Sequence, residues 1–328
     1  MYVPQKYLAK STSWRHAIKI VLESDEKLLI VEVMHGMCNR IRAYASAAVI
    51  ARKSHRRMVL VRKPDVHTGA RFSDLFDLSS SSVIVSEDDV LAYVQSFGRS
   101  TEHYDYMNST EKGALIVTKT IKHIYVRSSF ELSSDTQYSE MELRSAYHEI
   151  SRHISSSVRE HLSALMQRKI QGTSMIGAHV RMLVDQKADI PGIEKLKKSS
   201  VNGLGLMYEA EKYRRQCHVR YFVPHIQNAL DKFPRSIIFI ASDSQEAIDV
   251  VNDSFARMST VVHTDISKLL RCRGVDRRGP FCSQLALSEF LFLATSDVLL
   301  TSTWSSTTDL LLRLHDGEQR SGCAESLG

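Results

Sequence analysis

The sequence lacks the local signals of several common protein classes. Its N-terminal stretch has neither the apolar core nor the small-residue cleavage site of a signal peptide. No run of about 18 apolar residues occurs, so we expect no membrane span. As written, the chain is therefore expected to be soluble and cytoplasmic. If its true start lies further upstream, the lumen of the Golgi or of the endoplasmic reticulum becomes the expected location.

The usual fingerprints of nucleotide and metal sites are missing as well. The chain has no GxGxxG segment and no GxxxxGK followed by Ser or Thr, which excludes the motifs of dinucleotide-binding folds and P-loops. It also has no DxD motif of paired carboxylates. We therefore predict that the protein binds no metal and needs no cofactor.

Cysteine is scarce and irregularly spaced. The five cysteines are an odd number, and no two have the CxxC spacing that is typical of zinc sites. Cys272 and Cys282 lie close enough in the sequence to form a disulfide in an oxidising compartment. Two free thiols are the interpretation that we favour for this pair.

Strong charge of one sign is absent. The 328 residues carry a net charge of +6, and Lys and Arg are scattered apart from one dense cluster at 271–279. This cluster suggests a nucleic-acid-binding protein as an alternative. A groove for single-stranded nucleic acid needs interleaved aromatic residues, and only Phe281 lies nearby. We therefore expect no nucleic-acid partner.

What the sequence does contain is a repeated alternation of apolar runs and helical patterns. With 43% hydrophobic residues, a chain of this length can form two domains with cores of their own. Strand-length apolar runs that alternate with helices are typical of α/β folds with parallel sheets. We predict strands at 28–33, 58–61, 83–85, 115–118, 123–127, 175–180, 237–241, 260–263 and 298–301.

The expected helices divide this pattern into two series. A polar helical stretch at 139–170 separates them, so we predict domains at 1–165 and 166–328. A polar, irregular segment is expected at 183–212 and a loop at 264–282. Further helices are expected around 41–48, 72–76, 222–233 (ended by Pro234), 248–255, 284–295 and 307–314.

Polar side chains follow three strands of the second series. His179 and Arg181 leave one strand on the same face, because strand side chains alternate. Ser242 and Asp243 end the next strand, and STWSST at 302–307 follows another strand just before a helix. In parallel sheets ligands bind beyond these strand ends, and hydroxyls and amides at a helix N-terminus can hold phosphate. Each group also has an ordinary explanation, as a helix cap or as a strand-end residue satisfied by the backbone.

One loop of the first series also lies between the end of a strand and the start of a helix. HGMCNR at 35–40 follows a strand and opens a helix. Gly36 permits close approach of a ligand to the backbone, and Asn39 and Arg40 would face a cleft between the domains. The alternative is a tight turn with a helix cap.

Taken together and in order, these segments resemble the GDP-fucose-dependent fucosyltransferase superfamily. That group includes α-1,6-fucosyltransferases, nodulation fucosyltransferases and protein O-fucosyltransferases. The resemblance spans about residues 28–315. Its segments are HGMCNRIRAYASAAVIARKSHRRMVLV at 35–61 with DVHTGARFSDLF at 65–76, IGAHVRM at 176–182, FIASDS at 239–244 and LLTSTWSSTTDLLLRL at 299–314.

The resemblance implies a GT-B fold, in which two Rossmann-like domains face each other across a cleft. It also implies a glycosyltransferase that moves fucose from GDP-fucose to a hydroxyl of a glycan or protein without a metal ion. Arg181, with His179 beside it, would hold the β-phosphate and act in catalysis. The implied donor-binding residues are Gly36, Asn39, Arg40, Ser242, Asp243, Thr303, Ser305 and Ser306.

The chain departs from the family pattern at one point. Many members have the spacing HxRxxD, whereas the next carboxylate after Arg181 here is Asp185, one residue further on. This departure motivates a second hypothesis, a protein that binds the nucleotide sugar but no longer turns it over. If an acceptor hydroxyl needs a base, the candidates are His179, Asp185 and His35.

Overall fold

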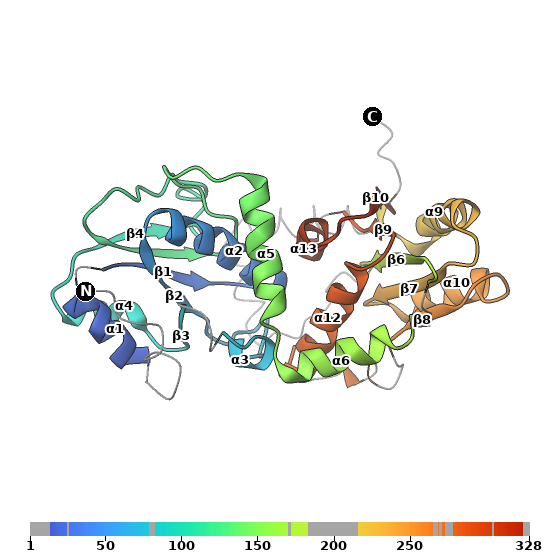
Figure 1. Ribbon diagram of the computed structural model, residues 1–328, viewed down its shortest axis with the longest axis horizontal. Coiled ribbons are helices and arrows are strands. Elements are labelled where there is room, and N and C mark those ends of the chain that lie inside the picture. Colours follow the sequence, from blue (N-terminus) through green and yellow to red (C-terminus); the bar gives the residue numbers. More distant parts are fainter. Residues whose placement is uncertain are drawn as a thin grey trace, which may run out of the picture. The chain divides into compact units, whose positions relative to one another are not determined.

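A computed structural model gives the fold of the chain (Figure 1). It describes residues 14–24, 26–78, 83–169, 172–182, 216–264, 268, 271–272, 278–303 and 305–323. The chain forms two compact units: unit 1 is Met1–Arg159 with Val275–Gln284, and unit 2 is Glu160–Gly274 with Leu285–Gly328. The chain therefore leaves unit 1, forms much of unit 2, and returns briefly before it completes unit 2.

Unit 1 is built around a five-stranded sheet in which every pair is parallel. Its order is β3-β2-β1-β5-β4. Residues 28–31 of the central strand β1 are buried, in agreement with their uninterrupted apolar sequence LLIV. The strands are β1 (Lys27–Val33), β2 (Arg56–Val61), β3 (Ile84–Ser86), β4 (Thr101–Asp105) and β5 (His123–Ser128).

Helices cover both faces of this sheet (Figure 1). Helices α1 and α4 pack on one face, where Ile18 and Val94 join a buried cluster with strand residues. Helix α2 begins after Gly36 and packs against α5, which starts with a capping box between Ser139 and Glu142. The helices are α1 (Trp14–Glu23), α2 (Met37–Lys53), α3 (Phe72–Leu75), α4 (Val90–Ser96) and α5 (Glu140–Arg152).

Unit 2 repeats the architecture with a second five-stranded parallel sheet. Its order is β10-β9-β6-β7-β8, so the chain first extends from β6 to one edge and then continues on the other side of β6. Ligands bind at such a switch point in open α/β sheets. The strands are β6 (Met175–Val180), β7 (Ile237–Ser242), β8 (Val261–His263), β9 (Val298–Thr301) and β10 (Glu318–Ser321).

The core of unit 2 has two apolar layers, one on each face of the sheet. On one face, Phe222 of α9 and Val251 of α10 pack against β6 and β7. On the other face, Phe292 of α12 packs edge-on against Phe239 at 4.7 Å between ring centroids. The helices are α6 (Ser156–Met166), α9 (Val219–Lys232), α10 (Gln245–Phe255), α12 (Pro280–Leu293) and α13 (Ser306–Leu314).

Most predicted strands and helices are confirmed within a few residues, but several predictions are wrong. Residues 115–118 form no strand, and Ile116 makes only an isolated bridge to Ser134. The single helix predicted at 139–170 is two helices, α5 and α6, because the chain turns at 153–155. The elements α1, α4, β4 and β10 were not expected. The segment predicted to be irregular at 183–212 lies outside the described residues.

The cysteine prediction is also wrong. Cys272 and Cys282 are both disulfide-bonded, not free thiols. A second disulfide joins Cys217 and Cys323 across 106 residues of sequence, with 4.2 Å between their Cα atoms. Cys38 is a buried thiol. Sequence spacing suggested the nearer pair, but it gave no signal for the distant pair, because only the fold brings Cys217 beside the end of β10.

Candidate functional site

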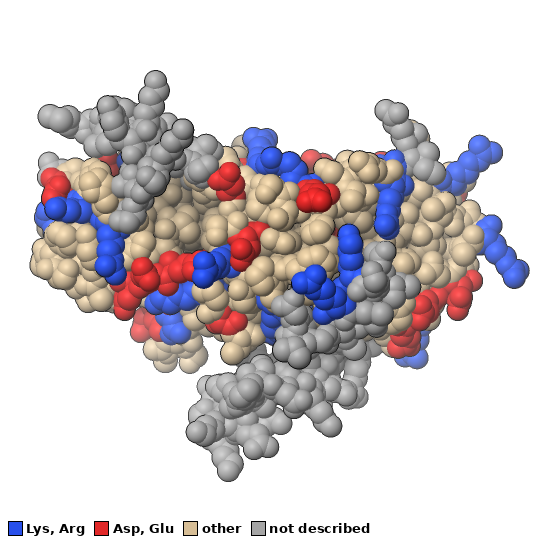
Figure 2. All heavy atoms as spheres, turned by 90° about the horizontal axis from the view of Figure 1, so that it is seen from below, with Lys and Arg blue, Asp and Glu red and all other residues tan. Residues whose placement is uncertain are grey.

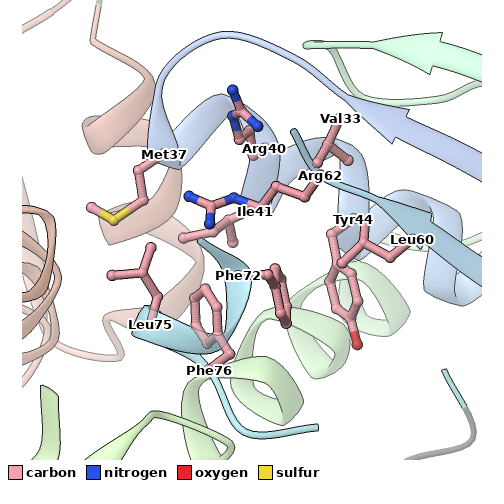
Figure 3. Close-up of a pocket in the computed structure, with 10 residues that line it drawn as sticks. All are labelled: Val33, Met37, Arg40, Ile41, Tyr44, Leu60, Arg62, Phe72, Leu75 and Phe76. Atoms are coloured by element: carbon pink, nitrogen blue, oxygen red, sulfur yellow. The ribbon is translucent and has the colours of Figure 1, made fainter. Parts of the chain in front are cut away.

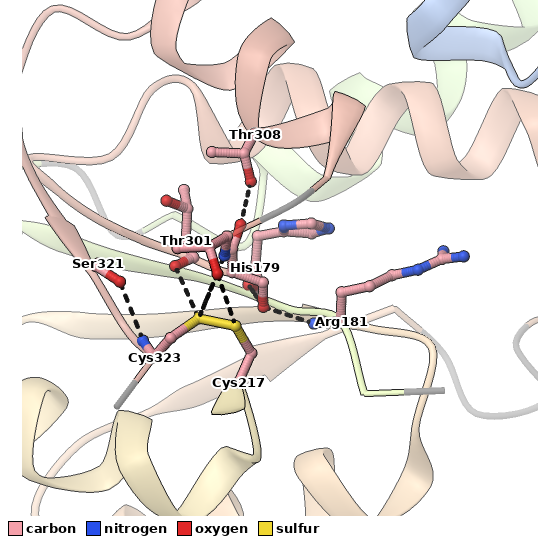
Figure 4. Close-up of a disulfide and its surroundings, with 9 residues drawn as sticks. His179, Arg181, Cys217, Thr301, Thr308, Ser321 and Cys323 are labelled. Carbon is pink, nitrogen blue, oxygen red and sulfur yellow. Dashed lines mark hydrogen bonds between the residues drawn. A yellow bond between two sulfur atoms is a disulfide. The ribbon is translucent and has the colours of Figure 1, made fainter. Parts of the chain in front are cut away.

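The carboxyl end of β6 presents His179 and Arg181 in the same direction, as strand alternation predicts (Figure 4). His179 is 4% exposed, and its ring lies edge-on to Phe290 of α12 at 5.9 Å. Burial, with a smaller effect of the nearby Arg181 charge, lowers the pKa of His179 to about 3. The imidazole is therefore neutral at physiological pH, and its Nδ1 has no hydrogen-bond partner within the described part of the chain.

Arg181 is paired with the carboxylate that follows β7. Its Nε lies 3.2 Å from Oδ2 of Asp243, and the Met182 amide donates to Oδ1 of Asp243 at 3.0 Å. The two side chains are 38% and 21% exposed, so the pair can be reached by a ligand. Ser242, just before Asp243, donates its hydroxyl to the Val180 carbonyl at 2.8 Å. These contacts hold the ends of β6 and β7 together.

Ser302, which was not among the predicted site residues, links the end of β9 to the end of β6. It is fully buried. Its hydroxyl donates to the carbonyl of His179 at 3.1 Å and accepts from the amide of Arg181 at 2.9 Å. Ser302 therefore sets the backbone from which Arg181 extends. The STWSST segment indicated this loop, but only the register of β6 beside β9 singles out its first serine.

The other hydroxyls of this loop are held by local contacts. The Thr303 amide donates to Sγ of Cys323 at 3.2 Å, and the Thr303 hydroxyl lies 3.3 Å from Sγ of Cys217. Ser305 is the N-cap of α13 and accepts from the Thr307 amide at 3.3 Å. Ser306 is the first residue of α13. The loop thus begins against the Cys217–Cys323 disulfide (Figure 4) and ends in a capped helix.

The loop predicted in unit 1 is organised by Arg40. This side chain is only 3% exposed. It donates from Nε to the His35 carbonyl at 2.6 Å and from Nη1 to the Lys63 carbonyl at 2.7 Å, and its Nη2 lies 2.6 Å from Asp65. All three contacts are within unit 1, so Arg40 shapes the loop around it.

The neighbouring residues of this loop have distinct environments. Gly36 is the N-cap of α2 in an extended conformation, and the Asn39 side chain accepts from Nη2 of Arg42 at 2.8 Å. His35 adopts the left-handed region at φ 64°, which is uncommon for a non-glycine residue. Its ring lies 4.8 Å from that of His67, and burial followed by the His67 charge lowers the pKa of His35.

A buried carboxyl group of unit 2 was also missed. Glu289 of α12 is 9% exposed, and burial raises its pKa from 4.5 to about 7. It adjoins Phe290, which contacts His179. The only sequence signal was a carboxylate within an apolar helix. Asp185, the fourth residue after Arg181, lies outside the described residues.

The switch point of unit 2 has groups that can bind a phosphate. Arg181 supplies a cation, the first turn of α13 supplies amides, and Asp243 orients the cation. Among the described residues, no group of three or more His, Cys, Asp or Glu side chains could hold a metal ion. No described helix is both long and apolar enough to cross a membrane.

Comparison with known proteins shows likeness in structure but not in sequence. No protein-family model matches the chain, and no curated protein matches it. A solved structure of an Arabidopsis thaliana FUT1 mutant in complex with GDP matches with a TM-score of 0.59 at 12% identity. That match covers 97% of this chain and 76% of the other. The chain has the fold of a fucosyltransferase.

Two further structures agree with this likeness. Fucosyltransferase NodZ from Bradyrhizobium matches with a TM-score of 0.54 at 17% identity, over 89% of this chain and 93% of NodZ. POFUT1 in complex with GDP matches with a TM-score of 0.55 at 10% identity, over 91% of this chain and 98% of POFUT1. At these identities the comparisons establish the α/β fold with two Rossmann-like units.

Proposed function

We propose that this fucosyltransferase-like chain is a glycosyltransferase that moves fucose from GDP-fucose to a hydroxyl group of a glycan or protein, without a metal ion. The observation that carries the proposal is the Arg181–Asp243 pair, braced by Ser302 at the switch point of unit 2. The fold likeness to structures that contain GDP or GDP-fucose supports the choice of donor.

Arg181 has the central role in this proposal. When the sugar–phosphate bond breaks, its electron pair passes to an oxygen of the β-phosphate. The acceptor oxygen bonds to the sugar carbon, and its proton passes to water. A preorganised cation stabilises the developing charge by roughly 3–4 kcal/mol, as one oxyanion-hole donor does. Among the described residues, the contact with Asp243 uses Nε of Arg181, and we propose that both Nη atoms form a fork around the phosphate.

The remaining predicted residues take supporting roles. His179 is neutral and therefore adds no positive charge that would repel Arg181. We propose that Ser242 and Asp243 lie beside the guanosine, and that Thr303, Ser305 and Ser306 line the pyrophosphate. Gly36, Asn39 and Arg40 are proposed to approach the donor from unit 1. A cation-like transition state needs no strong base for the acceptor proton.

The nucleic-acid alternative gains no support. On the face shown in Figure 2, the Lys and Arg side chains of the described residues are interspersed with Asp and Glu side chains. Most of the basic cluster at 271–279 lies outside the described residues.

Calorimetric titration with GDP, UDP and ADP tests the donor, and nucleotide release from the corresponding sugars tests turnover. We expect GDP to bind most tightly and GDP-fucose to release GDP in the presence of an acceptor mixture. Equal or absent binding of the three nucleotides would overturn the proposal. Tight GDP binding without turnover under any acceptor would support the inactive binding protein instead.

A further inference from the structure

A small cavity inside unit 1 has no room for an organic ligand. It lies between the side chains of Arg40 and Arg62 and the rings of Phe72 and Phe76 (Figure 3). Its volume is about 10 Å³, close to the space that one water molecule needs. The polar groups of unit 1 that a larger partner can reach therefore lie on its surface.

The surface loop that follows strand β4 contains an acceptor sequence for N-linked glycosylation. Asn108, Ser109 and Thr110 match the pattern Asn-x-Ser/Thr, in which the middle residue is not proline. All three residues are exposed. Strand β4 is the last strand of the order β3-β2-β1-β5-β4, so this loop lies at an edge of the sheet of unit 1 (Figure 1).

The side chains of this acceptor sequence are held only by local contacts. The hydroxyl and the amide of Thr110 donate to Oδ1 of Asn108 at 2.9 and 3.2 Å. Nδ2 of Asn108, the atom that glycosylation modifies, makes a long, exposed contact of 3.4 Å with Oε1 of Glu111. Within the described part of the chain, the side-chain hydrogen bonds of Asn108 and Thr110 are thus confined to this turn. An enzyme can therefore bind the acceptor sequence by rearranging the turn alone, without disturbing the sheet.

A second sequence of the same pattern lies in a different environment. Asn252, Asp253 and Ser254 belong to helix α10, and the side chain of Asn252 is half-buried. The carbonyl of Asn252 accepts from the Ala256 amide at 2.9 Å, as part of the helical hydrogen bonding. Binding of this segment by an enzyme would require the helix to unwind. The fold therefore favours Asn108 over Asn252.

The disulfide bonds point independently to the compartment in which such oligosaccharides are attached. Cys217 is joined to Cys323, and Cys272 and Cys282 are disulfide-bonded as well. Disulfides form and persist in oxidising compartments such as the lumen of the endoplasmic reticulum, and they are rare in the cytosol. Asparagine residues of the Asn-x-Ser/Thr pattern are glycosylated in secreted proteins, which pass through that lumen.

We propose that Asn108 is the attachment site of an N-linked oligosaccharide. In the transfer, Nδ2 of Asn108 forms a bond to the anomeric carbon of an oligosaccharide carried on a polyprenyl diphosphate. The bond from that carbon to the diphosphate oxygen breaks, its electron pair stays on the leaving diphosphate, and Nδ2 loses one proton to solvent. An oligosaccharyltransferase catalyses this step. The site belongs to unit 1 alone and does not depend on the donor proposed above.

Expression of the full chain in cultured eukaryotic cells, behind a cleavable secretion signal, tests this site. Mass spectrometry of the peptide that contains residue 108, before and after peptide-N-glycosidase treatment, measures the fraction of chains that carry a glycan. We expect a glycan on Asn108 of the wild type that the glycosidase removes, leaving aspartate in its place. Asn108→Gln and Thr110→Ala should lose this glycan, whereas Thr110→Ser should keep it because the acceptor pattern is retained.

Asn252→Gln is the matched control, because it removes the other sequence of this pattern and should leave the glycan on Asn108. Unmodified Asn108 in the secreted wild type would overturn the proposal, as would an equal glycan content in Asn108→Gln and the wild type. The occupancy of Asn108 is measured on the wild type itself, so the proposal can be refuted even if a variant does not fold.

Discussion

Removing the Arg181 side chain separates a role in catalysis from a role in stability. Arg181 forms an ion pair with Asp243, and the two side chains are 38% and 21% exposed. Ion pairs of this exposure contribute about 1 kcal/mol or less to stability, because water screens them. Arg181→Ala should therefore leave the free energy of unfolding within about 1 kcal/mol of the wild type.

The expected effect on the reaction is much larger. If Arg181 stabilises charge on the departing GDP, its loss should cost about 3–4 kcal/mol in the transition state, which corresponds to about 10²–10³ in kcat. GDP affinity should fall less than kcat, because the interaction strengthens as charge develops. Arg181→Lys keeps the charge but loses the planar fork, so it should restore only part of the rate.

The assay measures the single-turnover rate with GDP-fucose and the melting temperature on the same preparation. Arg168→Ala is a suitable control, because Arg168 is also an arginine of unit 2, and its side chain donates to the His263 carbonyl and not to Asp243. It should match the wild type in rate. An Arg181→Ala protein that is stable and fully active would refute the reasoning. So would a loss of activity that merely follows a loss of folded protein.

Three further outcomes are expected. The pKa of Glu289 is raised from 4.5 to about 7 in the folded state, so the folded state loses stability as pH rises from 4.5 through 7, by about 3 kcal/mol in total. Urea unfolding at pH 5 and pH 8 should show Glu289→Gln to be more stable than the wild type only at pH 8. If the free energy of unfolding depends on pH equally in Glu289→Gln and in the wild type, the prediction is wrong. Replacing Cys217 and Cys323 together by Ser should lower the free energy of unfolding by about 2–4 kcal/mol and weaken GDP binding, since both sulfurs contact Thr303. If the double variant binds GDP as tightly as the wild type, the disulfide does not contribute to GDP binding. Transfer activity should survive EDTA, and complete loss that manganese restores would show that a metal takes part.

The sequence was sufficient for most of the fold because buried parallel strands leave a clear local pattern. Strands β6 and β9 were predicted at their observed bounds and β7 within a residue, since both faces of each strand are covered and most of their positions are apolar. The edge strand β10 escaped notice because its polar, half-exposed sequence has no such pattern. The helix break between α5 and α6 was missed for a similar reason, as no Gly or Pro marks it.

Sequence also pointed to the strand ends that carry the candidate site, because the carboxyl ends of parallel strands lie along one edge of a sheet. The sequence did not predict which groups within that site would pair with one another. Ser302 meets Arg181 across 121 residues of sequence, and Asp243 meets Met182 across 61. The Cys217–Cys323 disulfide likewise depends on what distant segments place around these two residues. Local periodicity reports whether a residue is buried, but only tertiary packing determines which buried polar groups find a partner.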